Sequence, residues 1–212
     1  FCIFTTDVAI EQPLLNEAFR YAMNDTFNML TVDGEMSTND TVLIFANGAA
    51  GNAKISEKNA HYDLFTEALK AVATNATKSI AKDGEGATKV VTVTVTGAAN
   101  DNDAVLAAKS IANSMLVKTA IFRRDPNWGR VVQSAGASGA LIDPDKFLVE
   151  FAGVKVAQDG GTQPFDREVM AEMLEKNDIQ VHIDLGVGNA SATVFTCDLT
   201  YDYIKINAEY HT

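Results

Sequence analysis

The most constraining feature of the sequence is the segment Lys89–Thr96 (KVVTVTVT), in which valine and threonine alternate strictly from Val91 onward. Successive side chains of a β-strand point to opposite faces of its sheet, so this alternation places the valines on one face and the threonines on the other. The segment closely follows Asp83–Gly86 (DGEG), which ends a long helical pattern. The chain therefore contains at least one well-defined strand preceded by a helix.

Helical periodicity recurs elsewhere along the chain. From Ala60 to Lys82, apolar residues recur at helical spacing over the longest such stretch. Shorter amphipathic patterns predict helices at about Glu11–Asn24, Asp101–Met115 and Asp166–Glu175, and a short helix after the turn at Asp125–Gly129.

Alternating or continuously apolar runs predict the remaining strands. They lie at Cys2–Thr6, Thr41–Asn47, Lys118–Arg123, Phe147–Phe151, Ile179–Leu185, Ala192–Asp198 and Tyr201–Asn207. This order of elements predicts an α+β fold with long helices early and a strand-rich C-terminal part. We treat residues 1–212 as one domain, with Asp143–Asp145 (DPD) as a weak candidate boundary.

Charge and hydropathy exclude several classes of partner. The net charge is −11, from 28 acidic and 17 basic residues, and such a surface repels phosphate backbones, so we expect no nucleic-acid partner. No apolar run approaches the roughly 18–20 residues that a membrane helix needs, so we expect a chain that does not cross a membrane.

Cysteine and histidine usage indicates the compartment and argues against a metal. Cys2 and Cys197 lie within apolar runs, and a secreted disulfide scaffold would be richer in cysteine. We therefore expect buried free thiols in a reducing compartment, the cytoplasm. The three histidines, His61, His182 and His211, are scattered without zinc-ligand spacing, so we expect no metal site.

Three compact polar segments are candidates for function. Val32–Thr41 (VDGEMSTNDT) concentrates carboxylates and hydroxyls before an apolar strand, although local evidence alone favours an Asp-Gly turn that enters this strand. Gly84–Lys89 (GEGATK) sets Glu85 between glycines that allow close approach to a ligand, although a solvated loop also suits it. Asp125–Arg130 (DPNWGR) holds the single tryptophan, which more often packs a loop down than stacks on a substrate.

Taken in order, these segments resemble a known enzyme family. The sequences FTTD, VDGEMSTNDT, GEGATK, RDPNWGR and the C-terminal KINAEYHT are similar to those of the ornithine acetyltransferases, also called glutamate N-acetyltransferases, of arginine biosynthesis. The resemblance covers essentially the whole chain, and the blocks are specific in combination.

The resemblance implies a self-processed protein. The chain starts with Phe1, not Met, and we expect it to be the β subunit, the C-terminal product of autoproteolysis. The nucleophile would be a Thr two residues before Phe1, outside the printed chain. The family implies a Thr-nucleophile fold shared with the DmpA-type aminopeptidases, an α subunit from the same precursor, and an α2β2 heterotetramer.

The implied reaction is a ping-pong acetyl transfer. N2-acetylornithine would acetylate the Thr hydroxyl, with the free amine of that Thr as the base, and glutamate would then take the acetyl group. Glu85, Asn207 and Thr212 match substrate-binding positions of the family, whereas a frayed tail is the ordinary interpretation of the last two. His211 stands where the family often has Arg. The resemblance implies no cofactor, with acetyl-CoA as a further candidate donor.

The sequence leaves two alternative functions open. A self-processed amidase or aminopeptidase of the same fold would pass the acyl group to water instead of glutamate. A non-catalytic structural subunit or metabolite-binding module would use the same fold without acyl transfer.

Overall fold

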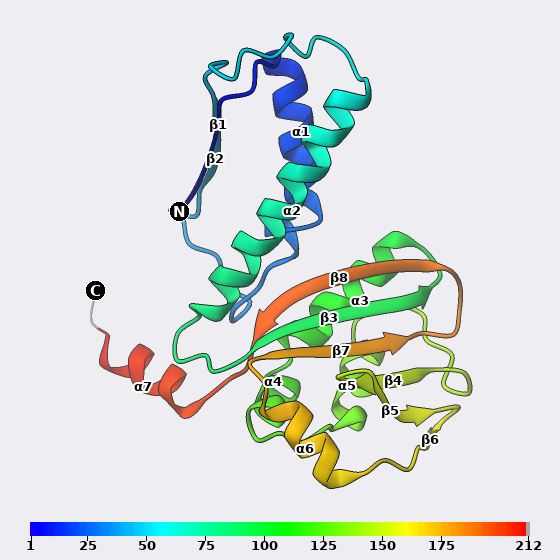
Figure 1. The fold of residues 1–212 in the computed structure, drawn as a ribbon. Coiled ribbons are helices and arrows are strands. Elements are labelled where there is room, and N and C mark those ends of the chain that lie inside the picture. Colours follow the sequence, from blue (N-terminus) through cyan, green and yellow to red (C-terminus); the bar gives the residue numbers. More distant parts are fainter. Residues whose placement is uncertain (211–212) are drawn as a thin grey trace. The chain divides into compact units, whose positions relative to one another are not determined.

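The computed structural model describes residues 1–210 and divides into two compact units (Figure 1). The first unit comprises Phe1–Asn28 and Glu35–Thr77. The second comprises Met29–Gly34 and the chain from Lys78 onward. The turn at Asp143–Asp145, which the sequence suggests as a weak boundary, lies within the second unit, where the Asp143 amide donates to the carbonyl of Leu185.

The first unit packs a two-stranded parallel sheet on helices. Its strands β1 (Cys2–Thr6) and β2 (Val42–Ala46) pair in register from Cys2–Val42 to Thr6–Ala46. Its helices are α1 (Gln12–Asn24) and most of α2 (Ala60–Lys82), and the 3₁₀ turn η1 (Phe27–Met29) follows α1. The core of this unit contains Phe4, Leu69 and several small residues of α1 and α2.

The second unit is built on a six-stranded sheet in the order β6-β5-β4-β7-β3-β8. The strands are β3 (Val90–Ala98), β4 (Leu148–Phe151), β5 (Val154–Gln158), β6 (Gly161–Thr162), β7 (Asp178–Asp184) and β8 (Ala190–Cys197). The helices are α3 (Asp101–Asn113), α4 (Met115–Phe122), α5 (Trp128–Gly136), α6 (Arg167–Glu175) and α7 (Tyr201–Glu209). The β3–β7 pair is parallel and the other pairs are antiparallel.

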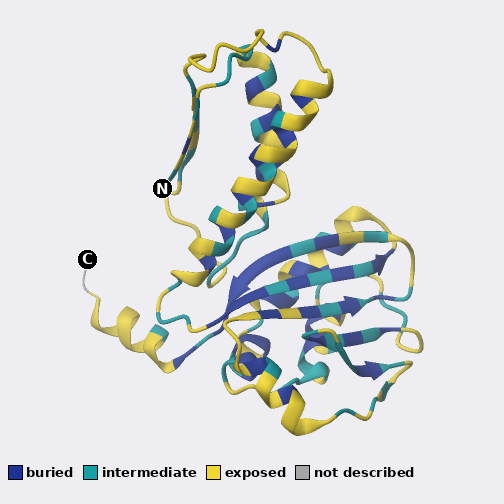
Figure 2. Ribbon diagram, in the orientation of Figure 1, coloured by how far each residue is buried: buried dark blue, intermediate teal, exposed yellow. Residues whose placement is uncertain are grey.

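The alternation of β3 produces the predicted two-faced strand. Val91, Val93 and Val95 are fully buried, and α3 packs against β3 and β8 while α5 packs against β4. The intervening threonines of β3 are half-buried. Figure 2 shows buried residues running along β3, β7 and β8, so the apolar core lies against this sheet.

The connection between β7 and β8 passes close to the C-terminal end of β3, at Gly97. This residue has a φ of +65°, and the amides of Val187 and Gly188 both donate to its carbonyl, at 2.9 and 2.7 Å. A Cβ at this position would lie 2.2 Å from Oδ1 of Asp184. Only glycine therefore fits here, because both the backbone conformation and the space exclude a side chain.

Most sequence-predicted elements are confirmed, but two predicted strands are helices. Lys118–Arg123 falls in α4, because the Ser114 side chain caps this helix by accepting from the amide of Val117. Tyr201–Asn207 falls in α7, where Thr200 accepts from the amide of Asp202. Short apolar alternation is ambiguous between strand and helix, and the caps decide it here.

The structure also differs from the sequence prediction at the junction of α3 and α4 and at strands β5 and β6. The helix predicted at Asp101–Met115 ends at Asn113, and α4 starts at Met115 after the intervening Ser114. Strands β5 and β6 have no counterpart among the predicted elements, because neither carries a long alternating run.

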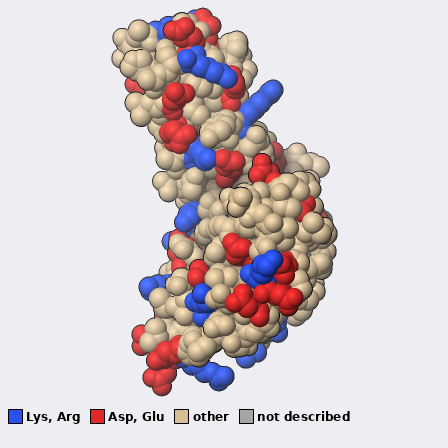
Figure 3. All heavy atoms as spheres, turned by 90° about the vertical axis from the view of Figure 1, so that its right-hand side faces the viewer, with Lys and Arg blue, Asp and Glu red and all other residues tan. Residues whose placement is uncertain are grey.

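The surface carries both signs of charge. On the face drawn in Figure 3, acidic and basic side chains are interspersed, as in a solvated surface. No single helix among residues 1–210 is long and apolar enough to cross a membrane; α3 and α4 meet the length and composition criteria together but are bent by 56° at their junction.

The two cysteines are free but differ in burial. Cys197 is buried, as predicted, whereas Cys2, at the start of β1 on the same face as buried Phe4, is only half-buried. Burial raises the pKa of the Cys197 thiol, and it also raises the pKa of the Cys2 thiol.

This difference predicts selective alkylation. Thiolate is the reactive form, so a thiol that is both buried and held protonated reacts slowly. Iodoacetamide at pH 8 should label Cys2 well before Cys197, and peptide mass spectrometry would measure the two rates. Labelling of both at equal rates in the native protein would contradict the burial of Cys197, and equal labelling in 6 M guanidinium is the control.

Candidate functional site

Strand pairing brings the Gly84–Lys89 loop and helix α7 together. Val90 at the start of β3 pairs with Cys197 at the end of β8. The pairing is antiparallel, so the loop that precedes β3 and the helix that follows β8 must leave the sheet at the same end. Two segments far apart in the sequence therefore become neighbours.

Asp198 fixes the loop to the end of β8. Its carboxylate accepts from the amide of Thr88 at 2.8 Å, from the amide of Lys89 at 2.9 Å and from the Thr88 hydroxyl at 2.5 Å. Asp198 is buried. These three hydrogen bonds satisfy the buried carboxylate and hold the loop backbone in one conformation.

Gly86 lets the loop approach the first turn of α7 closely. Its carbonyl accepts from the Thr200 hydroxyl at 2.7 Å, and its φ is +67°. A Cβ on Gly86 would lie 2.7 Å from the backbone nitrogen of Tyr203. The sequence suggested that the glycines beside Glu85 allow a ligand to approach closely. In the structure Gly86 instead allows the backbone of α7 to approach the loop.

The result is a direct contact between Glu85 and Asn207. Asn207 Nδ2 donates to Glu85 Oε2 at 2.5 Å and also to the carbonyl of Tyr203 at 3.0 Å. Both side chains are exposed, so a small molecule can reach them. The second bond fixes the Asn207 amide on its own helix, and the first engages one oxygen of the Glu85 carboxylate, Oε2.

The Val32–Thr41 segment contributes its first residues to the same region. Tyr203 Oη donates to Asp33 Oδ2 at 2.9 Å, which links the segment to α7. Asp33 thus places a carboxylate next to α7, the helix that carries Asn207. From Glu35 onward this segment belongs to the first unit.

Lys118 holds the backbone next to Asp33. Its Nζ donates to the carbonyl of Val32 at 2.5 Å, to the Thr196 hydroxyl at 2.9 Å and to Cys197 Sγ at 3.6 Å. Lys118 is 2% exposed, and this burial lowers the pKa of its ammonium group. The buried Nζ is thus surrounded by three hydrogen-bond acceptors, which offsets the cost of removing it from water.

The predicted site residues divide into those that meet and those that do not. Glu85 and Asn207 are in contact, whereas Thr212 and His211 lie outside the described residues. Trp128 lies in another part of the second unit and stacks on Phe147 with ring centroids 6.1 Å apart, which agrees with a packing role. Within residues 1–210 no group of His, Cys, Asp and Glu is arranged to hold a metal ion.

Sequence reasoning missed the residues that position this site. Asp198 is the last residue of one predicted strand, and Tyr203 lies within another. Lys118 is the first residue of a predicted strand that belongs to helix α4. A charged residue within an apolar run was the available signal, since such a residue is either exposed or paired.

Comparison with known proteins identifies the family. A model of the ArgJ family matches residues 1–212. The chain belongs to the ArgJ family. It is 47% identical over 211 residues to the "Arginine biosynthesis bifunctional protein ArgJ" of Caldanaerobacter subterraneus, covering 98% of this chain and 52% of that protein. It is 48% identical over 208 residues to the protein of the same name from Geobacter sulfurreducens, covering 98% of this chain and 53% of that protein.

A solved structure of the family has the same fold. The crystal structure of the "Arginine biosynthesis bifunctional protein argJ" from Bacillus halodurans matches with a TM-score of 0.94 at 38% identity, covering 99% of each chain. The α+β fold class predicted from the sequence is thus confirmed, and the match includes both units. The chain spans about half the length of the curated ArgJ relatives it matches.

The Asp198 contacts predict a large stability effect. Asp198→Ala leaves two donors of Thr88 and the amide of buried Lys89 without their acceptor, and we expect it to lower the free energy of unfolding by about 3 kcal/mol. Urea denaturation followed by circular dichroism would measure this. Asp83→Ala is the matched control, because Asp83 is exposed and lies in the same connection; a change of less than about 0.5 kcal/mol is expected there. Equal effects of the two substitutions would contradict the proposed anchoring.

Proposed function

We propose that this chain is the β subunit of a glutamate N-acetyltransferase, which moves the acetyl group of N2-acetylornithine to glutamate in arginine biosynthesis. Membership of the ArgJ family supports this proposal, together with the names of its relatives. The structural observation that carries it is the exposed Glu85–Asn207 pair, in which a carboxylate and an amide meet across 122 residues of sequence. Such a pair suits an amino acid, which presents both an ammonium and a carboxylate.

The proposed reaction has two balanced steps. The hydroxyl of the Thr two residues before Phe1 attacks the acetyl carbonyl of N2-acetylornithine, the amide C–N bond breaks, and ornithine leaves with the proton. The amine of glutamate then attacks the acetyl ester, the C–O bond breaks, and the Thr hydroxyl is restored as N-acetylglutamate departs. The α-amine of that Thr, freed by autoproteolysis, is the proposed base, since its pKa of about 7.7–8.0 leaves a neutral fraction near pH 7.5.

Each site residue has a proposed role in binding. Glu85 pairs with the ammonium group of the substrate through Oε1, or assists transfer of its proton, while Asn207 orients the Glu85 carboxylate. Thr212, which lies outside the described residues, is assigned to the substrate site by the family resemblance alone. No cofactor is needed, and acetyl-CoA is a second donor to be tested.

The exposed apolar residues on the outer face of the β1–β2 sheet favour a second polypeptide as partner. A parallel pair of strands is seldom found with one face uncovered. Yet Ile3, Leu43 and Phe45 on this face are 59%, 43% and 58% exposed. We propose that the α subunit from the same precursor covers them, in an α2β2 assembly located in the cytoplasm. Such an assembly accounts for relatives about twice as long as this chain.

The competing amidase function is not favoured, because the matched relatives carry a biosynthetic name. The two functions differ in the acceptor of the acetyl group, which is glutamate in one and water in the other.

An acceptor assay tests the proposed function. The full protein supplied with N2-acetylornithine and glutamate should release ornithine and N-acetylglutamate in equal amounts, measured by liquid chromatography and mass spectrometry. Release of acetate at a rate that glutamate does not change, without N-acetylglutamate, would refute the transferase. Acetyl-CoA supplied in place of N2-acetylornithine tests whether it also serves as a donor.

Substitution of Glu85 tests the proposed binding role. Glu85→Gln keeps the size of the side chain but removes the charge that pairs with the ammonium group, so kcat/KM should fall by about 10- to 100-fold. Asp83→Asn is the control, since it removes a charge from the same connection without touching Asn207. Unchanged kinetics of Glu85→Gln would exclude the role.

Substitution on the outer sheet face tests the partner. Phe45→Asp places a charge on the proposed interface without disturbing the core, because Phe45 is exposed in this chain. Co-purification of the two subunits should be lost, whereas Leu141→Asp, at an exposed position of the second unit, should retain it. Retention of the complex by Phe45→Asp would contradict the assignment of this face.

A further inference from the structure

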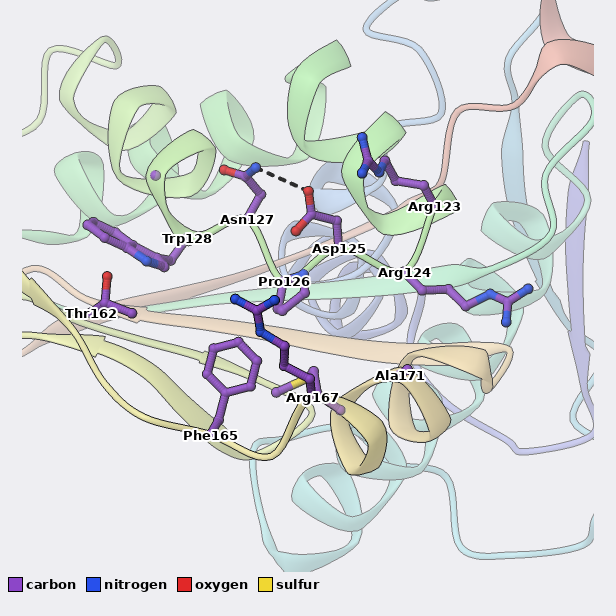
Figure 4. Close-up of a pocket in the computed structure, with 12 residues that line it drawn as sticks. Arg123, Arg124, Asp125, Pro126, Asn127, Trp128, Thr162, Phe165, Arg167 and Ala171 are labelled. Atoms are coloured by element: carbon purple, nitrogen blue, oxygen red, sulfur yellow. Dashed lines mark hydrogen bonds between the residues drawn. The ribbon is translucent and has the colours of Figure 1, made fainter.

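A separate cavity of the second unit gathers aromatic and cationic side chains. It lies between the turn after α4, the start of α5, and the segment from β6 to α6, and its volume is about 630 Å³. In Figure 4 the rings of Trp128 and Phe165 face the same space, and the guanidinium of Arg167 extends into it toward Pro126. Arg123 and Arg124 stand at the rim and point outward. None of these residues belongs to the Glu85–Asn207 site.

The cationic lining stands out against the composition of the chain. The sequence has five arginines and a net charge of −11, yet Arg123, Arg124 and Arg167 all line this one cavity. Arg124 forms an ion pair with Glu175. In the part of the chain that the structure describes, Arg123 and Arg167 form no ion pair. The cavity therefore keeps cationic groups that intramolecular carboxylates do not neutralise.

Its one acidic lining residue is already engaged. Asp125 accepts from Asn127 Nδ2 at 3.2 Å, and its own amide donates to the carbonyl of Ala120 at 2.9 Å, which closes the turn after α4. Arg124 within this turn has a φ of +61°, a conformation that side-chain-bearing residues seldom adopt. The turn thus places Arg123 and Arg124 at the rim of the cavity, while the carboxylate of Asp125 is directed to Asn127.

The aromatic walls are held in place by the core. Trp128 stacks on buried Phe147 at an interplanar angle of 29°, and both Trp128 and Phe165 pack against the main core cluster. A ring fixed in this way loses little conformational entropy when another ring stacks on it. The walls are therefore prepared for a flat ligand.

Together these features select the chemistry of the ligand. A guanidinium binds phosphate in two-point geometry, and aromatic rings stack on the faces of bases. A volume of this size suits a single small ligand. The acidic surface of the chain disfavours a long polyanion such as nucleic acid. We propose that this cavity binds a nucleoside phosphate, with the base between Trp128 and Phe165 and the phosphate on Arg167.

Calorimetric titration of the full protein with ADP tests this site. ADP should bind, whereas adenosine and inorganic phosphate should each bind at least tenfold more weakly, because each retains only one of the two kinds of contact. Absence of ADP binding at millimolar concentration would overturn the proposal. Equal binding of phosphate and ADP would also overturn it, since the aromatic walls would then contribute nothing.

Variants locate the bound nucleotide. Arg167→Gln should weaken ADP binding by about tenfold or more, since a charge-assisted contact is lost. Arg20→Gln is the matched control, because Arg20 is an exposed arginine of α1 in the other unit and should leave binding unchanged. Equal affinity of the two variants would place the nucleotide elsewhere and refute the site. Arg167 is exposed, so circular dichroism should show an unchanged fold, and acetyl transfer from N2-acetylornithine should persist in Arg167→Gln.

Discussion

Strand β3 is the element on which the core and the candidate site both depend. Its fully buried valines Val91, Val93 and Val95 each contribute about 1.5–3 kcal/mol by leaving water, and they form the centre of the apolar face that α3 covers. Its two neighbours, β7 and β8, fix its register on both sides. Since a shift by one residue would turn every valine toward solvent, the register is determined by the core. The positions of the loop before β3 and of the helix after β8 follow from it.

Buried polar groups then make this junction rigid. Asp198 and Lys118 are both buried, and each is surrounded by hydrogen-bonding partners of the opposite kind. Burying a charge is costly unless its partners are already in place, so these contacts favour one arrangement of the surrounding backbone. The exposed Glu85 and Asn207 therefore rest on a well-ordered support, which is what a binding site for a small polar substrate requires.

Family membership concerns the whole chain, whereas the geometry of the candidate site concerns a few side chains. The relatives and the solved structure cover both units, and they place the chain in the ArgJ family as a whole. The Glu85–Asn207 contact instead concerns two side chains, and it gives the proposed acetyltransferase a location for its substrate. The uncovered apolar face of β1 and β2 completes the proposal with a surface for a partner. The arginine-lined cavity is separate from both, so its ligand can be tested without reference to acetyl transfer.

The sequence by itself determined which faces would be buried and where most elements would lie. The alternation in Lys89–Thr96 and the helical spacing in Ala60–Lys82 are local patterns, and water excludes apolar side chains whatever the rest of the chain does. The same local pattern was ambiguous in the short runs at Lys118–Arg123 and Tyr201–Asn207, where capping side chains selected helices.

Only the tertiary structure decided which polar groups meet. The family resemblance suggested Glu85 and Asn207 separately, but nothing in their local sequence specifies a contact across 122 residues. Nor does any spacing reveal that Asp198 fixes the loop or that Lys118 fixes Val32. These pairings depend on the register of β3 and β8 and on the close approach at Gly86, which are long-range consequences of packing one core.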